Sequence, residues 1–137
     1  MSTFKLKIVA SNKVFFDGEA QSLVVPIAGD GLKGFLAHHE NAVAPIESGE
    51  MKIVDSEGKI IEAFVGSGFI ECFDNSIDVV CISAELPEDI DEKRAREALE
   101  RAEEKLRQKQ SIYQFHQSQA DLSRAMERLK VKNRHHI

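Results

Sequence analysis

Short apolar runs separated by turn residues fill the first two thirds of the chain. From Phe4 to Ile8 apolar and charged side chains alternate, which is the period-two pattern of a strand with one buried face. Similar runs follow at residues 14–16, 23–25, 51–54, 59–65, 69–73 and 77–83. Asp55 to Gly58 and the pair Asp74-Asn75 predict hairpin turns. Because eight to ten short strands at this spacing need two layers to bury their apolar faces, the pattern predicts an antiparallel β-sandwich or flattened barrel.

The last part of the chain has a helical pattern instead. All eight glycines and all three prolines lie at or before Pro87, and none follows it. Asp89, with Glu92 three residues later, predicts a capped helix start. A stripe of apolar residues follows at the helical spacing, supported by the i,i+4 pairs Glu97–Arg101 and Glu103–Arg107. The stripe consists of Ala95, Ala98, Leu99, Ala102 and Leu106.

A second helix is predicted after Ser111, which forms another capping pattern with Gln114. Its apolar stripe consists of Ile112, Phe115, Leu122, Met126 and Leu129. Two such helices pack as an antiparallel hairpin, so we expect an α+β chain with a β-sandwich domain at 1–84 and a helical hairpin at 85–137. The connection at 107–111 contains no helix breaker, so one continuous helix is also open to this sequence. The hairpin and the extended form would then differ by little free energy.

Composition and charge limit the possible functions. The chain has 137 residues and a net charge of −5 at pH 7, with no basic face to suggest a nucleic-acid partner, so we expect protein partners. Cys72 and Cys81 are too few for a secreted disulfide framework, and the amino terminus, Met1 to Lys5, lacks the apolar h-region of a signal peptide. No apolar run approaches the ~20 residues of a membrane-spanning helix. We therefore expect a cytosolic protein with reduced thiols that reaches a membrane only through a partner.

Two local motifs suggest chemistry that their context does not support. Gly29 to Gly34 satisfies the G-x-G-x-x-G pattern, but no helical stripe follows it, so an exposed loop with glycine at positive φ is the prediction. A small dinucleotide-dependent enzyme built on this segment is the alternative, and it would require a parallel sheet. His38-His39-Glu40 has no fourth ligand at a recognised spacing, which favours a loop over a metal site. The sequence predicts no catalytic residue and no metal site.

Arginines in the two predicted helices form the remaining candidate site. Arg94 and Arg101 share a helix face with Ile90, and Arg124 shares a face with Arg128. Guanidinium groups suit phosphate oxygens, while Glu85 and Asp91 can accept hydrogen bonds from a base or a ribose. The alternative is an ordinary solvated face, in which the arginines form weak ion pairs with the many glutamates of this chain.

Taken together, the β domain, the Asp-Ile-Asp-x-x-Arg-Ala segment at 89–95 and the alanine-rich hairpin closely resemble the epsilon subunits of bacterial rotary ATP synthases. The resemblance covers essentially the whole chain. The strongest landmarks are residues 14–18, 34–36 with His39, 65–71, 101–104 and 124–131. This sequence departs from the family pattern at 36–41, where Leu-Pro-Gly-His-Ala-Pro is usual, and at 66–68, where Ser-Gly-Gly is usual.

The resemblance implies a non-catalytic subunit at the cytoplasmic face of the bacterial cell membrane that needs no cofactor. Its β domain would bind the gamma subunit and the ring of c-subunits, and so couple ion translocation to rotation. The expected rotor contacts are Gly29, Asp30, Gly31, Leu32, Lys33 and His39. Its helices would extend along gamma toward the catalytic hexamer and inhibit ATP hydrolysis.

The resemblance also implies ATP as a regulatory ligand that favours the folded hairpin. Expected phosphate contacts are Arg94, Arg101, Arg124 and Arg128, and expected adenosine contacts are Glu85, Ile90, Asp91 and Ala95. A protein-docking adaptor that binds no nucleotide is the alternative, and a titration with ATP distinguishes the two.

Overall fold

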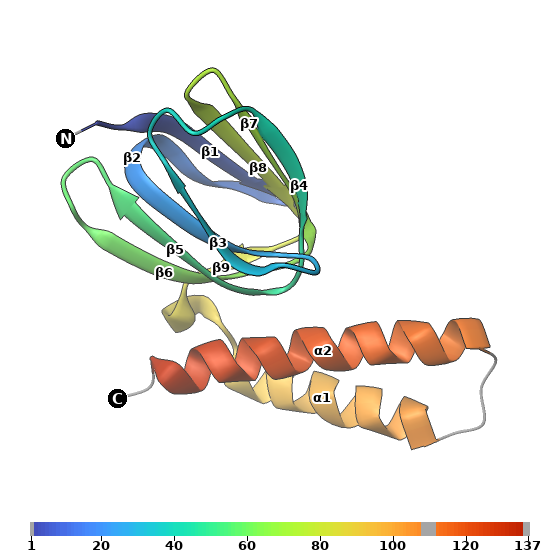
Figure 1. Cartoon of the computed structure of the whole chain (residues 1–137). Helices are drawn as coiled ribbons and strands as arrows, with labels where there is room; N and C mark the ends of the chain where they lie inside the picture. The colour runs from blue at the N-terminus through green and yellow to red at the C-terminus, as the bar shows by residue number, and fades with distance from the viewer. Residues whose placement is uncertain (1, 108–111, 136–137) are drawn as a thin grey trace. The chain divides into compact units, whose positions relative to one another are not determined.

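A computed structural model describes the backbone of residues 2–107 and 112–135, and the side chains of this range except those of 112–116. The chain divides into two compact units, Met1–Leu86 and Pro87–Ile137, which are a β domain and a helical unit (Figure 1). The first unit ends two residues after the expected boundary at Ala84. Ala84 and Glu85 form a short strand that pairs with Val65 and Phe64, so these residues complete the β domain.

Within the described residues, the β domain contains nine strands joined by hydrogen bonds. The strands are β1 (Phe4–Ala10), β2 (Lys13–Ile27), β3 (Gly31–Leu36), β4 (Ala42–Ile46), β5 (Gly49–Asp55), β6 (Ile60–Val65), β7 (Gly68–Phe73), β8 (Ser76–Cys81) and β9 (Ala84–Glu85). One layer contains β1, β8, β7 and β4, and the other contains β2, β3, β5, β6 and β9 (Figure 1). The predicted sandwich is confirmed.

The 15-residue strand β2 joins the two layers. Its first half pairs with β1, and its second half pairs with β5 on one edge and with β3 on the other. β1 in turn pairs with β8 in parallel, whereas every other strand pairing in the described residues is antiparallel. Among the described residues, this parallel pair is the one departure from the predicted antiparallel sandwich. Alternation of side chains shows which face a strand buries, but it carries no information on the direction of a neighbour about 70 residues away.

The core lies between the layers and follows the predicted alternation. Phe4, Leu6 and Ile8 are buried, while the intervening Lys5 and Lys7 are exposed. They pack with buried side chains from the other strands, including Leu23, Val25, Met51, Ile53, Ile70 and Val79. Since a fully buried side chain of this size contributes about 1.5–3 kcal/mol, this core is the main stabilising element of the domain.

Both predicted hairpin turns are confirmed. At the β5–β6 turn, one carboxylate oxygen of Asp55 accepts hydrogen bonds from the backbone NH groups of Glu57 and Lys59, each at 2.9 Å. At the β7–β8 turn, Asp74 and Asn75 have φ values of 49° and 58°. Two consecutive residues at positive φ match the twist of a tight hairpin, and asparagine and aspartate tolerate that conformation better than most residues.

The glycine-rich segment at 29–34 forms a hairpin. Gly29 and Gly31 have φ values of 85° and 76°, as expected for a turn that uses glycine. However, Gly31 also begins β3, which pairs antiparallel with β2, so the prediction of a loop over the whole segment is wrong. Glycine lowers strand propensity, which hides such a strand in the sequence. The glycines lead directly into β3, which pairs antiparallel with β2, and not into a helix, so the dinucleotide-enzyme alternative is excluded.

The helical unit contains a short 3-10 helix, η1 (Pro87–Asp89), followed by α1 (Glu92–Arg107) and α2 (Ile112–Arg134). Asp91, and not Asp89, caps α1. Its carboxylate accepts a hydrogen bond from the backbone NH of Arg94 at 3.1 Å, while Asp89 belongs to η1. The proline favours this extra turn, and the turn moves the helix start beyond the first aspartate. Ser111 lies outside the described residues, so its capping role stays a prediction.

The two helices run antiparallel and form a hairpin (Figure 1). Small side chains are prominent among those that they bury. Ala95 and Ala102 are buried on α1, and Ala125 and Leu129 are buried on α2. Met126, which was predicted on the inner stripe, is 54% exposed. Ala125 takes the inner position because the alanines of α1 allow the two helices to approach closely. The predicted stripe on the second helix was chosen from large apolar residues, so it did not include this alanine. The side chains of Ile112 and Phe115 lie outside the described set.

Candidate functional site

A cavity of about 300 Å³ lies between α1 and α2. Three alanines form its apolar part, Ala98 and Ala102 from α1 and Ala125 from α2. Their methyl side chains hold the helices together without filling the space between the longer residues beside them. The remaining lining residues are all charged: Arg101, Lys105, Asp121, Arg124 and Arg128.

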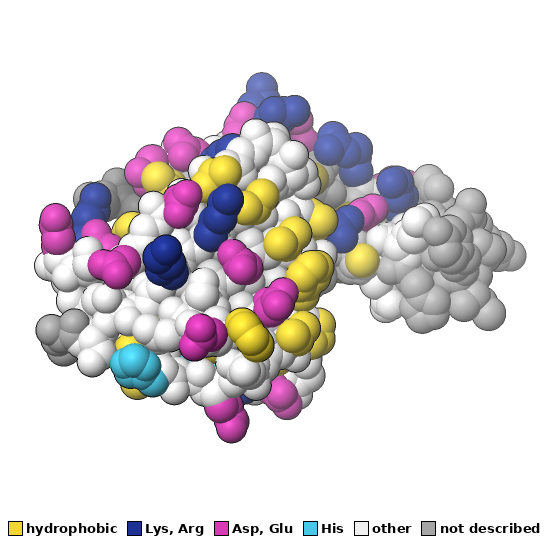
Figure 2. Space-filling view, turned by 90° about the horizontal axis from the view of Figure 1, so that it is seen from above, with side chains coloured by type: hydrophobic (Ala, Val, Ile, Leu, Met, Phe, Trp, Pro, Cys, Tyr) yellow, Lys and Arg dark blue, Asp and Glu magenta, His cyan; other side chains and the backbone are white. Residues whose placement is uncertain are grey.

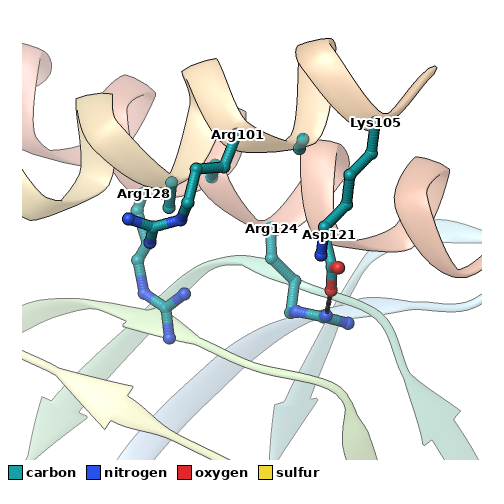
Figure 3. Close-up of a pocket in the computed structure, with 8 residues that line it drawn as sticks. Arg101, Lys105, Asp121, Arg124 and Arg128 are labelled. Atoms are coloured by element: carbon teal, nitrogen blue, oxygen red, sulfur yellow. Dashed lines mark hydrogen bonds and ion pairs between the residues drawn. The ribbon is translucent and has the colours of Figure 1, made fainter. Parts of the chain in front are cut away.

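Helical spacing brings these charged side chains together. Arg101 and Lys105 are one turn apart on α1, and Arg124 and Arg128 are one turn apart on α2, so each pair projects from one face. The antiparallel packing places Arg101 opposite Arg128, and Lys105 opposite Arg124. Figure 3 shows the arginine side chains extending from the two helices to the same side of the hairpin.

The cavity is electropositive in a chain whose net charge is negative. Its four cationic side chains and one carboxylate give a formal charge of +3. Asp121 forms an ion pair with Arg124. Arg101 has no ion-pair partner within 4.0 Å among the described residues, so its predicted pair with Glu97 does not form there. An anion with several charges would relieve the repulsion among these cations.

The structure brings together three of the eight residues predicted to contact ATP, namely Arg101, Arg124 and Arg128. Four others lie just before α1 or in its first turn and do not line the cavity. Ile90 and Ala95 are buried, Arg94 is exposed, and one oxygen of Asp91 is engaged by the helix cap. Glu85 belongs to β9 in the β domain.

Sequence reasoning missed Lys105 and Asp121. Each carries a weak signal, because Lys105 follows Arg101 by one turn and Asp121 precedes Arg124 by three residues. The selection was based on arginines, so a lysine and an acidic residue on the same faces were passed over. Only the pairing of the two helices shows that both belong to one cavity.

In the β domain, five of the six residues expected to contact the rotor, those at 29–33, form the exposed end of the β2–β3 hairpin, and the sixth, His39, follows the other end of β3. The backbone NH of Asp30 donates a hydrogen bond to the carbonyl oxygen of Ile27 at 3.0 Å, which closes the turn around Gly29. Leu32 is 68% exposed. The Lys33 ammonium group lies 5.4 Å from the centre of the Phe35 ring, and the centres of the Phe35 and His39 rings are 4.7 Å apart. The tip therefore presents an apolar residue on a braced hairpin.

An exposed apolar row crosses the other layer and was not predicted. The strand register aligns Pro45 of β4, Phe69 of β7, Val80 of β8 and Val9 of β1. Phe69 is 47% and Val80 43% exposed. The view from above shows exposed hydrophobic side chains gathered at one side of the β domain, beside charged ones (Figure 2). Contiguous exposed apolar residues of this kind are typical of protein-binding surfaces.

The two cysteines offer no reactive thiol at the surface. Cys72 and Cys81 are both free and buried. Burial raises the pKa of both thiols above the ordinary value, and a hydrogen bond with the backbone of Ser83 opposes this in part for the pKa of Cys81. Since the thiolate is the nucleophile, neither side chain is poised for chemistry.

Comparison with known proteins decides the family. Residues 3–87 match the model of the beta-sandwich domain of the ATP synthase delta/epsilon chain, and residues 88–133 match the model of its long alpha-helix domain. The chain belongs to the ATP synthase delta/epsilon family. The resemblance derived from the sequence is thus confirmed.

Similar curated proteins carry the name ATP synthase epsilon chain. The one from Ruminiclostridium cellulolyticum is 38% identical over 134 residues, which is 98% of each chain. The one from Caldanaerobacter subterraneus is 35% identical over 133 residues and is covered to 96%. These matches span essentially the full length of this member of the family.

Solved structures share the fold at lower identity. A chain in the Euglena gracilis mitochondrial ATP synthase has a TM-score of 0.78 and 21% identity, covering 93% of this chain and 79% of its own length. A chain in the central stalk and c-ring of the Tetrahymena thermophila mitochondrial ATP synthase has a TM-score of 0.66 and 12% identity, covering 93% of this chain and 95% of its own length. Among the described residues, no helix is long and apolar enough to cross a membrane.

Proposed function

We propose that this chain is a non-catalytic subunit of the rotary ATP synthase stalk whose helical hairpin binds ATP and regulates ATP hydrolysis. The observation that carries the proposal is the convergence of Arg101, Arg124 and Arg128 on one interhelical cavity. A volume of about 300 Å³ is at the lower end of small-molecule sites. The positively charged guanidinium groups of these arginines, on a chain that is acidic overall, suit a polyphosphate better than a neutral ligand.

The phosphates of ATP would occupy the cavity, and its adenosine would lie toward the start of α1. Arg94 is seven residues before Arg101 on the same helix face, or roughly 10 Å along the axis, and it would bridge the two parts. Ile90, Asp91 and Ala95 are neighbours of Arg94 near the start of α1, and they are the proposed adenosine contacts. The Asp91 side chain is exposed, whereas those of Ile90 and Ala95 are buried. Glu85 belongs to the β domain, so its predicted contact with adenosine stays a prediction.

Binding to the folded hairpin alone would make ATP a regulator. The cavity exists only while α1 and α2 are packed, because its lining comes from both helices. A ligand that binds only this state stabilises it by about 2.7 kcal/mol at 100 times its dissociation constant. High ATP would then hold the helices together and prevent their extension toward the catalytic hexamer, where the extended form blocks hydrolysis.

The β domain would connect this regulator to the rotor at the cytoplasmic face of the cell membrane. The exposed tip at 29–33, braced by Phe35 and His39, is the proposed contact with the c-ring. The apolar row of Pro45, Phe69 and Val80 is the proposed contact with the gamma subunit. The Tetrahymena complex with a similar chain is described as a central stalk and c-ring, which supports these partners. Coupling ion translocation to rotation would depend on these two contacts.

Calorimetric titration of the full chain with ATP tests the nucleotide part. Arg101→Ala should weaken ATP binding about tenfold or more, since a hydrogen bond to a charged group contributes about 1.5–3 kcal/mol. Arg96→Ala is the matched control, because Arg96 lies on the same helix and pairs with Glu92 outside the cavity. No binding at millimolar ATP, or equal losses in both variants, would leave the chain as a docking adaptor without a nucleotide site.

The regulatory part needs the assembled enzyme. Removal of residues 88–137 should raise ATP hydrolysis and leave ATP synthesis and rotor coupling largely intact. An enzyme that became uncoupled without a rise in hydrolysis would contradict the assignment of regulation to the helices and of coupling to the β domain.

A further inference from the structure

We propose that Asp121 is an internal counter-anion, a carboxylate that occupies Arg124 when no ligand is bound and competes with a phosphate group for it. This inference rests on the proposed nucleotide site and assigns a new specificity-determining residue to it. Asp121 is the only acidic side chain that lines the cavity among the described residues. Its carboxylate forms an ion pair with Arg124.

The Asp121–Arg124 ion pair is partly exposed, so a phosphate group can replace the carboxylate at Arg124. The side chains of Arg124 and Asp121 are 33% and 41% exposed, so water and ions reach them from the open side of the cavity. Ion pairs at this exposure are weak, because solvent screens the attraction and the long side chains lose freedom. A polyphosphate that contacts Arg101 and Arg128 as well as Arg124 can therefore displace the Asp121 carboxylate. A ligand that reaches only Arg124 would replace one ion pair with another and so gain little binding free energy.

Lys105 provides the displaced carboxylate with a second cation. It lines the same cavity from the opposite helix, and in Figure 3 its side chain extends toward the part of the cavity that holds Asp121 and Arg124. Without such a cation, a phosphate at Arg124 would face the Asp121 carboxylate directly and be repelled by it. Asp121 thus sets a charge threshold for the site and favours ligands with several phosphates.

The test is calorimetry of the full chain with ATP and with inorganic tripolyphosphate, which has no base or sugar. Asp121→Asn should bind both ligands at least about threefold tighter than the unaltered chain, the size expected from the release of one exposed ion pair. Glu127→Gln removes the same charge from the same helix outside the cavity and should change affinity less than twofold. Asp121→Glu keeps the carboxylate and should bind like the unaltered chain.

A second variant separates direct competition from a change of fold. In an Arg124→Ala background, Asp121→Asn should give no gain in affinity, because the group for which carboxylate and phosphate compete is gone. The counter-anion role is excluded if Asp121→Asn binds the ligands no tighter than Glu127→Gln does. It is also excluded if Asp121→Asn still raises the affinity in the Arg124→Ala background. Either result would leave the proposed ATP site in place. If neither the unaltered chain nor Asp121→Asn binds either ligand at millimolar concentration, both this inference and the proposed nucleotide site are excluded.

Discussion

The side-chain ammonium group of Lys132 donates a hydrogen bond to the backbone carbonyl oxygen of Pro87 at 3.1 Å. Lys132 lies in the last turn of α2, and Pro87 begins η1, just before α1. The bond therefore fastens the end of the helical unit to its beginning. Extension of the hairpin must break it, together with the contacts of the alanine face.

Replacement of Lys132 should weaken the folded hairpin. In Lys132→Met we expect a loss of about 1 kcal/mol, since the bond is charged but only part-buried. Thermal unfolding of the full chain measures this loss, and ATP should restore part of it. Lys130→Met, at an exposed position of the same helix, is the control and should have no comparable effect.

Gly68 should tolerate no side chain. A Cβ atom at this position would lie 2.0 Å from the carbonyl oxygen of Val80 and 2.7 Å from the Cα atom of Cys81, and neither backbone atom can move without disturbing the β7–β8 pairing. We expect Gly68→Ala to destabilise the β domain by about 2 kcal/mol or more, in the range of overpacked cores. Denaturant unfolding checks it.

Gly34 offers a comparison on another strand. A Cβ atom there would meet only a methyl group of Val24, at 3.9 Å, which is an ordinary contact. Gly34→Ala should therefore leave the free energy of unfolding within about 0.5 kcal/mol of that of the unaltered chain. Equal effects of the two substitutions would show that the close approach at Gly68 does not limit stability.

The buried thiols should make stability fall in alkaline solution. Burial raises the pKa of Cys72 and of Cys81 in the folded state, so the unfolded state releases these protons first as pH rises. Their contribution is fully present below the ordinary thiol pKa and is lost as pH rises through the raised folded value. Urea unfolding at increasing pH should show this decline, and the Cys72→Ala, Cys81→Ala double variant should show a smaller one.

The apolar row should be needed for assembly. Phe69→Glu places a charge in the middle of the row without entering the core, because the side chain is 47% exposed. We expect the isolated chain to fold normally and to bind the gamma subunit at least about tenfold more weakly, as for central apolar contacts in interfaces. Ile60→Glu, on the similarly exposed edge of the other layer, is the control and should bind normally. Pull-down or calorimetry with gamma measures both.

The sequence predicted the fold well wherever the signal was local. Alternation identified the buried face of β1 through Phe4 and Ile8, and turn residues located the β7–β8 hairpin. Non-local features were missed, such as the parallel pairing of β1 with β8. The cap of α1 was misplaced because Asp89 and Asp91 both suit a helix start, and only the course of the chain after Pro87 decides between them.

The residues of the candidate site also include some that were predicted from the sequence and some that were missed. Arg101, Arg124 and Arg128 were selected from spacing and family resemblance, and they line one cavity. Lys105 and Asp121 complete it, but their membership depends on which turn of α1 faces which turn of α2. The pattern of residues along one helix shows which face of that helix is buried. It does not show how the turns of that helix align along the axis with the turns of the neighbouring helix.

The double role of β2 has a mechanical consequence. This one strand is hydrogen-bonded to β1 in one layer and to β5 and β3 in the other, so the layers share a continuous stretch of backbone. Sliding one layer over the other would require breaking a ladder of backbone bonds all at once. Deforming a sandwich whose layers meet only through side chains needs no such rupture. We expect a β domain built in this way to resist torsion, which would suit the role in rotor coupling that we propose for it.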